Sequence, residues 1–189
     1  MNAVIEAINK RRSIRSYQSK LVSRDIIEAI IEAGNEAPSA MNSQPWRFVV
    51  VENEEFKKKL LLTALPHVKK ILETVKESDP IRFEAMTKRL NELPDPVYYS
   101  APVIVFVIGS GRFASQSCPL ACQNIMLAAY SMGIGSCWVG SGSMVNEDDE
   151  VKHILELKEE EIIFGPILLG YPEGYPERPA KRGPVVKWV

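Results

Sequence analysis

The sequence predicts one globular domain that mixes α-helices with β-strands. Its 189 residues, 46% of them apolar and 25% charged, suit a single domain with a sizeable hydrophobic core. Two runs, 103–108 and 162–169, are almost wholly apolar, which is typical of buried strands. Other segments place their apolar residues at helical spacing instead. Because no repeat, low-complexity tract or linker divides these patterns, we expect a single domain over residues 1–189.

The first half of the chain predicts two helices, a strand and a long helical region. Asn2 and Ser23 are suitable N-cap residues, and each precedes a segment with apolar residues at helical spacing. The second of these helices ends near Gly34, because Pro38 forbids its continuation. The expected elements are helices over 3–10 and from 24 to near 34, a strand over 46–51, and helix within the charged stretch 54–93, with a second start at Asp79-Pro80.

The second half predicts a buried helix among buried strands. The helix over 118–132, with Ser117 as its N-cap, is apolar nearly all round, which is typical of a helix covered on most sides. Gln123 and Asn124 lie within it, and their amides need partners either at a subunit interface or on nearby backbone. The other expected elements are strands over 103–108, 136–139 and 162–169, and a helix from Asn146 through Leu155.

The last nineteen residues, 171–189, differ from the rest of the chain. They contain four prolines, so they cannot form a helix. The final five residues, VVKWV, are too apolar to remain in water. At ~3.3 Å per residue such an extended arm could reach ~60 Å. We expect this C-terminal arm, residues 170–189, to cross onto another surface, most simply that of a second subunit.

Composition excludes several classes of function. A formal net charge of −1 gives no reason to expect a nucleic-acid or anionic-membrane partner. The longest apolar run, 103–108, is far shorter than the ~20 residues of a membrane helix. Residues 1–20 are too polar for a signal peptide, so the cytoplasm is the expected location.

The three cysteines form no even disulfide set. Their spacing, with the isolated His67 and His153, matches no common zinc pattern. We therefore expect reduced, buried thiols at Cys118, Cys122 and Cys137 and no metal site.

Three polar clusters could hold a ligand. The first is KRRSIRSY (10–17), which with Lys181-Arg182 of the arm would make a phosphate site if the side chains converge. The alternative is a solvated basic turn after a helix. The second is APSAMNSQPWRF (37–48), whose amide side chains suit the edge of a flat heterocycle and whose prolines restrict the loop. Its alternative is an ordinary polar turn.

The third cluster is MGIGSCWVGSG (132–142), where four glycines let a ligand approach the backbone closely. It is not a Rossmann fingerprint, because it follows a helix and Trp138 stands where the third glycine should be. Nor is there a P-loop, since the chain has no Gly-Lys-Ser/Thr sequence. The alternative is a tight turn into a buried strand.

Four segments together resemble the FMN-dependent nitroreductase family: RRSIRSY, PSAMNSQPWRF, QNIMLAAYSMGIGSCW, and GPILLGYPEGYP followed by Arg182. They occur in the family's order and span almost the whole chain. The resemblance implies an α+β fold with a central, mostly antiparallel sheet flanked by helices. It also implies an intertwined homodimer with two FMN sites at the interface, in which each C-terminal arm wraps the other subunit.

The resemblance also assigns residues to the FMN site. Arg11, Arg12, Ser13, Arg15, Lys181 and Arg182 would hold the phosphate and one edge of the flavin. Pro38, Ser39, Asn42 and Gln44 would come from the partner subunit. Trp138, Val139, Gly140 and Ser141 would run past the flavin ring. Two residues depart from the family: Ser117 stands where Asp is common, and Gly140 where Glu or another polar residue is common.

The activity implied by the resemblance is ping-pong transfer of hydride from NADH or NADPH, through FMN, to a nitroaromatic or quinone acceptor. The flavin does the chemistry, so no catalytic side chain is expected. Residues 67–93, which in the family help cover the substrate face, match no family pattern. Two alternatives stay open: another flavin reaction on the same scaffold, such as reductive dehalogenation or flavin consumption, and a non-catalytic flavin-binding or sensor protein.

Overall fold

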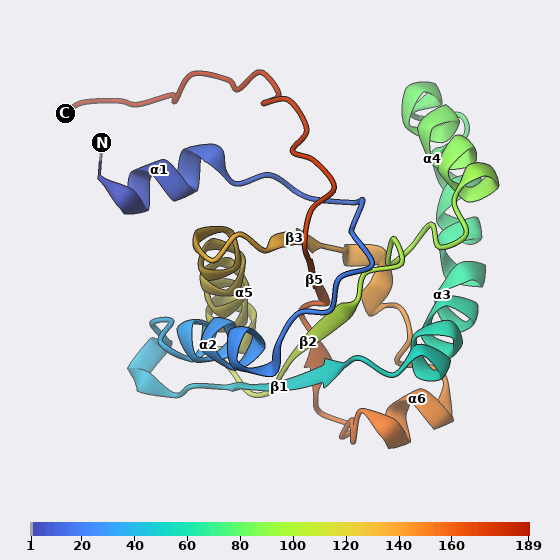
Figure 1. Cartoon of the computed structure of the whole chain (residues 1–189), viewed down its shortest axis with the longest axis horizontal. Helices are drawn as coiled ribbons and strands as arrows, with labels where there is room; N and C mark the ends of the chain where they lie inside the picture. Colours follow the sequence, from blue (N-terminus) through green and yellow to red (C-terminus); the bar gives the residue numbers. More distant parts are fainter. Residues whose placement is uncertain (1) are drawn as a thin grey trace.

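The computed structural model describes residues 2–189, and its helices surround one central sheet (Figure 1). The expected mixture of helices and strands is confirmed. In chain order the elements are α1 (Ala3–Lys10), α2 (Arg24–Asn35), the 3₁₀ turn η1 (Ala40–Asn42), β1 (Trp46–Val51), α3 (Glu54–Val75), α4 (Pro80–Glu92), β2 (Val103–Gly109), α5 (Ala114–Ser131), β3 (Gly135–Trp138), the 3₁₀ turn η2 (Gly140–Ser143), α6 (Asp149–Ile154), β4 (Ile162–Ile163) and β5 (Ile167–Gly170).

The named strands of the sheet pair antiparallel throughout, and among the described residues only the isolated Ser13–Ser136 bridge at its edge is parallel. Its strand order is β1-β2-β5-β3, and the short β4 pairs with the end of β2. The β1–β2 ladder runs from Trp46 opposite Gly109 to Val51 opposite Ile104. The α+β class with a mostly antiparallel sheet is thereby confirmed.

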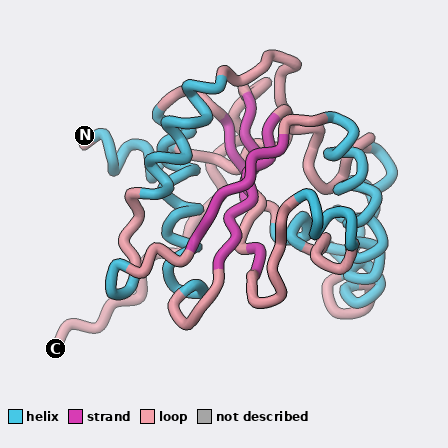
Figure 2. Tube along the Cα trace, turned by 90° about the horizontal axis from the view of Figure 1, so that it is seen from below, coloured by secondary structure: helices cyan, strands magenta, loops and turns pink. Residues whose placement is uncertain are grey.

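Strand β2 divides the hydrophobic core into two halves. Side chains alternate between the faces of a strand, so Ile104, Phe106 and Ile108 pack with α3, α4 and α6. Val103, Val105 and Val107 pack on the other face with α2 and α5. Figure 2 shows the strands between these two groups of helices. Burial on both faces explains why the sequence of β2 is continuously apolar rather than alternating.

Helix α5 is buried as predicted, but it begins four residues earlier than expected, at Ala114. Ser117 is therefore not its N-cap. That side chain is buried inside the helix, and its Oγ accepts a hydrogen bond from the Ala40 N–H at 3.4 Å. Asn124 uses the backbone alternative, since its Nδ2 donates to the Ala33 carbonyl at 3.0 Å.

Two other boundaries were wrong. Helix α6 begins after Asp148, whose Oδ1 accepts from the Val151 N–H at 3.0 Å, so Asn146 is not its cap. The single strand expected over 162–169 is two strands, β4 and β5, separated by a turn with a cis Gly165–Pro166 peptide. Proline lacks the N–H that a continuous ladder would use, which is consistent with the interruption.

The C-terminal arm has no helix, as expected, and no ladder beyond its first residues. Its start is tied to the segment after α1, because the Gln18 N–H donates to the Tyr171 carbonyl at 2.9 Å and Gln18 Nε2 to the Pro172 carbonyl at 2.8 Å. Its end extends beyond the body of the domain (Figure 1), and Trp188 is 90% exposed.

Within residues 2–189, no helix combines the length and apolar character needed to span a membrane.

Candidate active site

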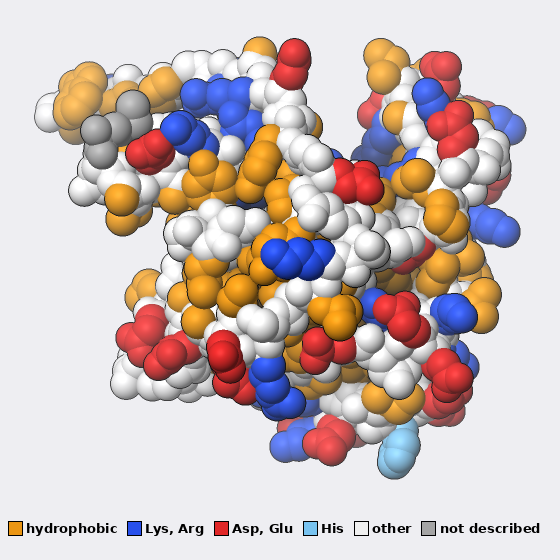
Figure 3. Space-filling model, in the orientation of Figure 1, with side chains coloured by type: hydrophobic (Ala, Val, Ile, Leu, Met, Phe, Trp, Pro, Cys, Tyr) orange, Lys and Arg blue, Asp and Glu red, His pale blue; other side chains and the backbone are white. Residues whose placement is uncertain are grey.

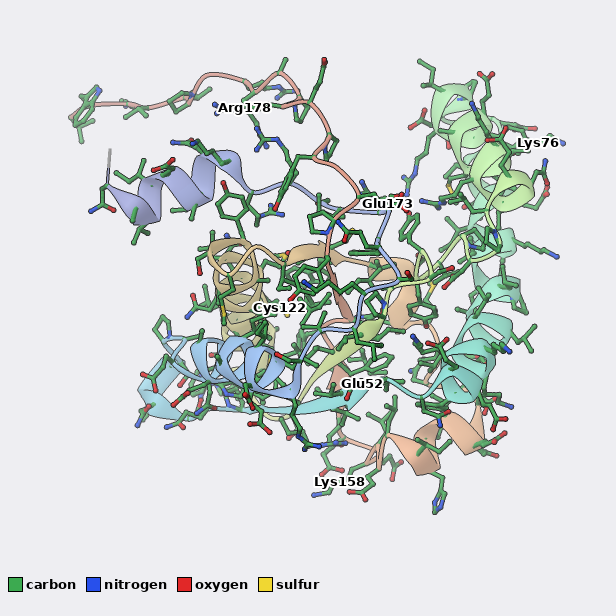
Figure 4. The ribbon with its side chains drawn as sticks, viewed as in Figure 1. Glu52, Lys76, Cys122, Lys158, Glu173 and Arg178 are labelled. Atoms are coloured by element: carbon green, nitrogen blue, oxygen red, sulfur yellow. The ribbon has the colours of Figure 1, made fainter. Side chains whose placement is uncertain are left out.

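A basic pocket of about 520 Å³ forms where the arm passes over the segment after α1. Figure 3 shows Lys and Arg side chains gathered between the arm and α1, and Figure 4 marks Arg178 on the arm there. We call it the basic pocket. Its lining residues are Ile8, Asn9, Arg11, Arg12, Ser13, Arg15, Pro176, Glu177, Arg178, Pro179 and Lys181.

The local fold fixes the floor of this pocket. The Ile14 N–H donates to the Ser136 carbonyl at 2.9 Å, and Ser13 forms a bridge with Ser136, so this segment follows the edge of β3. Gly135 allows the close approach, because a Cβ there would lie 2.8 Å from the Ile14 side chain. Burial of Ile14 in the core then holds the flanking arginines at the surface of the pocket.

The pocket's arginines keep donors available. Arg12 Nη1 donates to the carbonyls of Asn9 at 2.8 Å and Arg11 at 2.7 Å, which anchors this guanidinium at the end of α1. Two buried nitrogens, Arg11 Nη1 and Arg12 Nε, have no hydrogen-bond partner within residues 2–189. Buried donors of this kind are costly unless something accepts from them, and a phosphate group would do so.

The arm places two basic residues in the lining of this pocket. Lys181, a predicted site residue, is one of them, whereas Arg182 is not among the lining residues and is exposed. The other is Arg178, which was not predicted from the sequence. Arg178 lies three residues before Lys181 on the same arm, and this was the one sign of its place in the sequence. The path of a proline-rich arm cannot be predicted from sequence.

A second cavity of about 590 Å³, here called the cleft, adjoins the basic pocket because Arg15 lines both. Its lining residues are Arg15, Val68, Ile71, Arg82, Ala85, Met86, Arg89, Tyr99, Cys137, Trp138, Val139, Gly140, Ser141 and Met144. Figure 3 shows the surface hollowed between the arm and the α3–α4 hairpin. The structure thus brings the predicted 138–141 segment together with Arg15.

A backbone hydrogen bond to the turn before β5 holds the 138–141 segment. The Val139 N–H donates to the Pro166 carbonyl at 3.0 Å, so this N–H is not available to a ligand. Gly140 and Ser141 begin η2, and the first N–H groups of a helical turn have no acceptor inside that turn. A Cβ on Gly140 would meet nothing within 4 Å, so the cleft leaves space beside this backbone.

Helix α4, which lies within the 67–93 region, contributes a wall whose individual residues were not predicted from the sequence. Arg82, Ala85, Met86 and Arg89 all line the cleft. Their spacing of three, four and seven residues puts them on one helix face. No signal in the sequence distinguishes this face from the solvated one, because both carry charges.

The loop 38–44 lies elsewhere in the chain. Gln44 Nε2 donates to Asn42 Oδ1 at 3.0 Å, and the Gln44 N–H donates to Ser39 Oγ at 3.0 Å, so these polar groups bond mainly within the loop. Pro38 opens this loop. The loop contacts α5 at Ser117, whereas Arg12 lies beside Tyr130 and Ser131 at the other end of that helix. At 1.5 Å per residue, the two ends are about 20 Å apart.

The three cysteines are free and buried, as predicted. Burial raises the pKa of Cys118 to about 11 and that of Cys122 to about 12. For Cys137 burial also raises the pKa, against the opposing effect of Arg15. In the described part of the chain, no three His, Cys, Asp or Glu side chains cluster in a way that could hold a metal ion.

The sequence matches the model of the nitroreductase family over residues 8–171, which is most of the chain. The chain belongs to the nitroreductase family. A relative from Methanothermobacter thermautotrophicus, named as a candidate NADH dehydrogenase/NAD(P)H nitroreductase, is 32% identical over 92% of this chain and 79% of its own length.

Solved structures of nitroreductases have the same fold. A nitroreductase with bound FMN from Desulfitobacterium hafniense DCB-2 is 26% identical, with a TM-score of 0.78 over 99% of this chain and all of that one. A second, from Bacteroides fragilis NCTC 9343 and also with bound FMN, is 29% identical, with a TM-score of 0.74 over the whole of both chains. The resemblance stated from four short segments is therefore confirmed.

Proposed function

We propose that this nitroreductase-family chain binds FMN and transfers hydride from NADH or NADPH, through the flavin, to nitroaromatic or quinone acceptors. The observation that carries the proposal is the junction at Arg15, where the basic pocket, lined by arginines and a lysine, meets the cleft lined by 138–141. FMN has two corresponding parts: its phosphate would lie in the basic pocket and its planar ring in the cleft. The names of the family relatives above support the same reaction class.

The residues present fit FMN. Arg11, Arg12 and Ser13 would hold the phosphate together with Lys181 and Arg178, and the two buried donors without a partner among the described residues support this role. Arg182 would join them from the same arm. Arg15 would lie beside the ring, and Trp138, Val139, Gly140 and Ser141 would run along it.

A second copy of the chain would complete the site. Pro38, Ser39, Asn42 and Gln44 would come from the partner, because about 20 Å of α5 separates this loop from the basic pocket of its own chain. Two exposed apolar surfaces support a homodimer: the α1 residues Val4, Ile5 and Ile8, and the end of the arm with Val185, Trp188 and Val189. Their burial against a partner would be favourable.

When bound, FMN accepts hydride from a reduced nicotinamide and later delivers electrons to an acceptor. The chain's own groups bind and orient. Arg15 would put positive charge beside the ring, where it stabilises negative charge, and the N–H groups at the start of η2 would donate toward it. The open cleft lets donor and acceptor occupy the same place in turn, which is the expectation for ping-pong kinetics. No acid or base side chain is assigned.

A second candidate is reductive dehalogenation on the same scaffold. The observation that favours it is similarity to the iodotyrosine deiodinase of Thermotoga neapolitana, which is 26% identical over 97% of this chain and 94% of its own length. Release of iodide from an iodinated aromatic substrate, with no reduction of nitroaromatics or quinones, would favour this candidate over the first.

The test is an absorbance spectrum of the purified protein, before and after anaerobic addition of NADH or NADPH. We expect a flavin spectrum that bleaches with either nicotinamide and returns on addition of a nitroaromatic or a quinone. A flavin that does not bleach would indicate a binding or sensing role, or another electron donor. A colourless protein that also fails to take up added FMN would contradict the proposal.

A further inference from the structure

We propose that the cleft selects acceptors carrying an anionic group, such as a carboxylate, on a flat ring, with Arg89 and Arg82 of α4 as the recognising residues. This inference rests on the proposed function, whose acceptor it narrows from nitroaromatics and quinones in general to their anionic members. The reaction is otherwise unchanged, so the anionic group takes no part in electron transfer.

The lining of the cleft is positively charged. Three arginines line it, and no Asp or Glu of residues 2–189 does. None of the three takes part in an ion pair with another described residue. By contrast, Arg24 is paired with Glu28 and Arg47 with Glu161. The cleft therefore keeps positive charge that an anionic ligand could neutralise.

The Arg89 side chain is already held in place by Tyr99. Its Nη1 donates to the Tyr99 hydroxyl oxygen at 2.8 Å, and its Cζ lies 5.8 Å from the centre of that ring. Its Nε is buried and has no acceptor within the described chain. A guanidinium fixed on one side has less conformational freedom to lose when a carboxylate binds its other donors. Its planar fork matches the two oxygens of a carboxylate.

On the cleft face of α4, apolar side chains lie between two arginines. Arg82 and Arg89 stand seven residues apart on the cleft face, with Ala85 and Met86 between them. Val68 and Ile71 of α3 and the indole of Trp138 add further apolar lining. A flat ring fits the apolar part of such a site, and an anionic substituent fits either arginine.

The same lining disfavours a free amino acid. An ammonium group would need a carboxylate partner, and none of the described acidic side chains lines the cleft. A ring with a carboxylate alone should therefore react better than the zwitterion with the same ring, because three arginines would repel the ammonium.

The test uses the FMN-loaded protein, reduced photochemically so that no nicotinamide is present. Its reoxidation is followed with 4-nitrobenzoate, its neutral isostere 4-nitrobenzamide, cationic 4-nitrobenzylammonium and zwitterionic 4-nitrophenylalanine. The quantity compared is the ratio of second-order rate constants for the acid and the amide. Because intrinsic reactivities are the same for every variant, a change in this ratio reports the site alone.

We expect the acid-to-amide ratio to fall at least tenfold in Arg89→Gln and severalfold in Arg82→Gln. Arg89→Lys should recover part of it, because charge returns without the fork. The matched control is Lys88→Gln, which removes one positive charge from an exposed position of α4 outside the cleft. It should leave the ratio within twofold. An unchanged ratio in Arg89→Gln would overturn the proposal.

Binding supplies an independent readout. Benzoate, which cannot be reduced, should perturb the visible spectrum of the oxidised flavoprotein, with a dissociation constant that rises at least tenfold in Arg89→Gln. Weaker FMN binding in that variant with the charge preference intact would put Arg89 on the cofactor and overturn the proposal. If no acceptor reoxidised the reduced protein, the proposed function would fail, and the benzoate titration would still decide the anion preference.

Discussion

Arg89 and Tyr99 are hydrogen-bonded to each other in the lining of the cleft: the guanidinium on α4 donates to the tyrosine hydroxyl at 2.8 Å. Arg15 lies over the same ring, with its Cζ 5.8 Å from the ring centre. Tyr99 has a positive φ of 54°, a conformation that costs a non-glycine residue free energy. Asp95 supports this turn by accepting from the N–H groups of Val97, Tyr98 and Ser100. One ring thus links α4 to the basic segment.

The first prediction removes only this hydroxyl. Tyr99→Phe keeps the ring but not the acceptor, and a hydrogen bond to a charged group is worth about 1.5–3 kcal/mol. We expect the acid-to-amide ratio to fall about fivefold while FMN affinity stays within twofold, because Arg89 then loses its fixed position. The control is Tyr98→Phe, whose hydroxyl donates to the Gly142 carbonyl. That variant should lower Tm and leave the ratio nearly unchanged; equal effects of the two variants on the ratio would contradict a positioning role for Tyr99.

The second prediction ranks the arginines of the basic pocket. Arg15→Ala and Arg178→Ala should each raise the dissociation constant for FMN at least tenfold, because each removes a charged donor. Arg182→Ala should weaken binding less, since this residue lies outside the pocket lining. Fluorescence titration of apo-protein with FMN measures all three. Wild-type affinity in both Arg15→Ala and Arg178→Ala would remove these residues from the site.

The third prediction concerns the apolar end of the arm. Trp188 is 90% exposed in the single chain, so in a homodimer it should gain a partner surface. We expect light scattering to show a dimer of the wild-type protein at micromolar concentration. In Trp188→Glu the dissociation constant of the dimer should be at least tenfold larger. Lys187→Glu introduces the same side chain one position earlier and is the control. A monomeric wild type would contradict the shared site.

The fourth prediction contrasts two glycines of the 140–142 turn. A Cβ on Gly142 would lie 2.7 Å from the Tyr98 ring and 2.9 Å from Pro166, whereas one on Gly140 meets nothing within 4 Å. Gly142→Ala should therefore cost about 1–3 kcal/mol of stability through overpacking. Gly140→Ala should change the free energy of unfolding by less than about 0.5 kcal/mol. Urea unfolding of both variants is the measurement, and equal losses would mean that the turn does not have this packing.

The sequence predicted the parts of the fold that depend on continuous local patterns. The run 103–108 is short, β-branched and apolar at every position, which favoured a strand with both faces buried, and the structure has that strand. Helix caps were less certain, because Asn146 and Asp148 are both good cap residues two positions apart. The single strand expected over 162–169 was wrong because its apolar pattern outweighed the Gly165-Pro166 pair, although proline cannot donate to a ladder.

The candidate site was predictable only where its residues are contiguous. Arg11 to Arg15 and 138–141 are short segments with a recognisable chemistry, and the structure joins them through Arg15. Arg89 was not predictable, because its role depends on which face of α4 the tertiary packing turns toward the cleft. The same holds for Arg178, whose contacts depend on the path of an arm without secondary structure.

The fifth prediction concerns pH and the partly buried pair Arg47–Glu161. Arg47 Nε donates to Glu161 Oε1 at 2.8 Å and Nη2 to Oε2 at 2.7 Å, while Nη2 also donates to the Leu155 and Glu156 carbonyls. These bonds join β1 to the turn after α6. Arg47 lowers the pKa of the Glu161 carboxyl to about 2, and the Glu161 side chain is only 7% exposed.

Because the folded pKa lies below the ordinary value of 4.5, the carboxylate stabilises the fold fully above about pH 5. That contribution declines as the pH falls and is lost near pH 2, where the folded protein takes up the proton.

Glu161→Gln should therefore cost about 2 kcal/mol at pH 7 and progressively less toward pH 3. The control is Glu28→Gln, which breaks the exposed Arg24–Glu28 pair and should cost much less than Glu161→Gln at pH 7, because exposed ion pairs contribute little. Urea unfolding at a series of pH values measures both differences. If the loss of unfolding free energy in Glu161→Gln were the same at pH 7 and pH 3, then the packing of this side chain, rather than its charge, would account for its contribution.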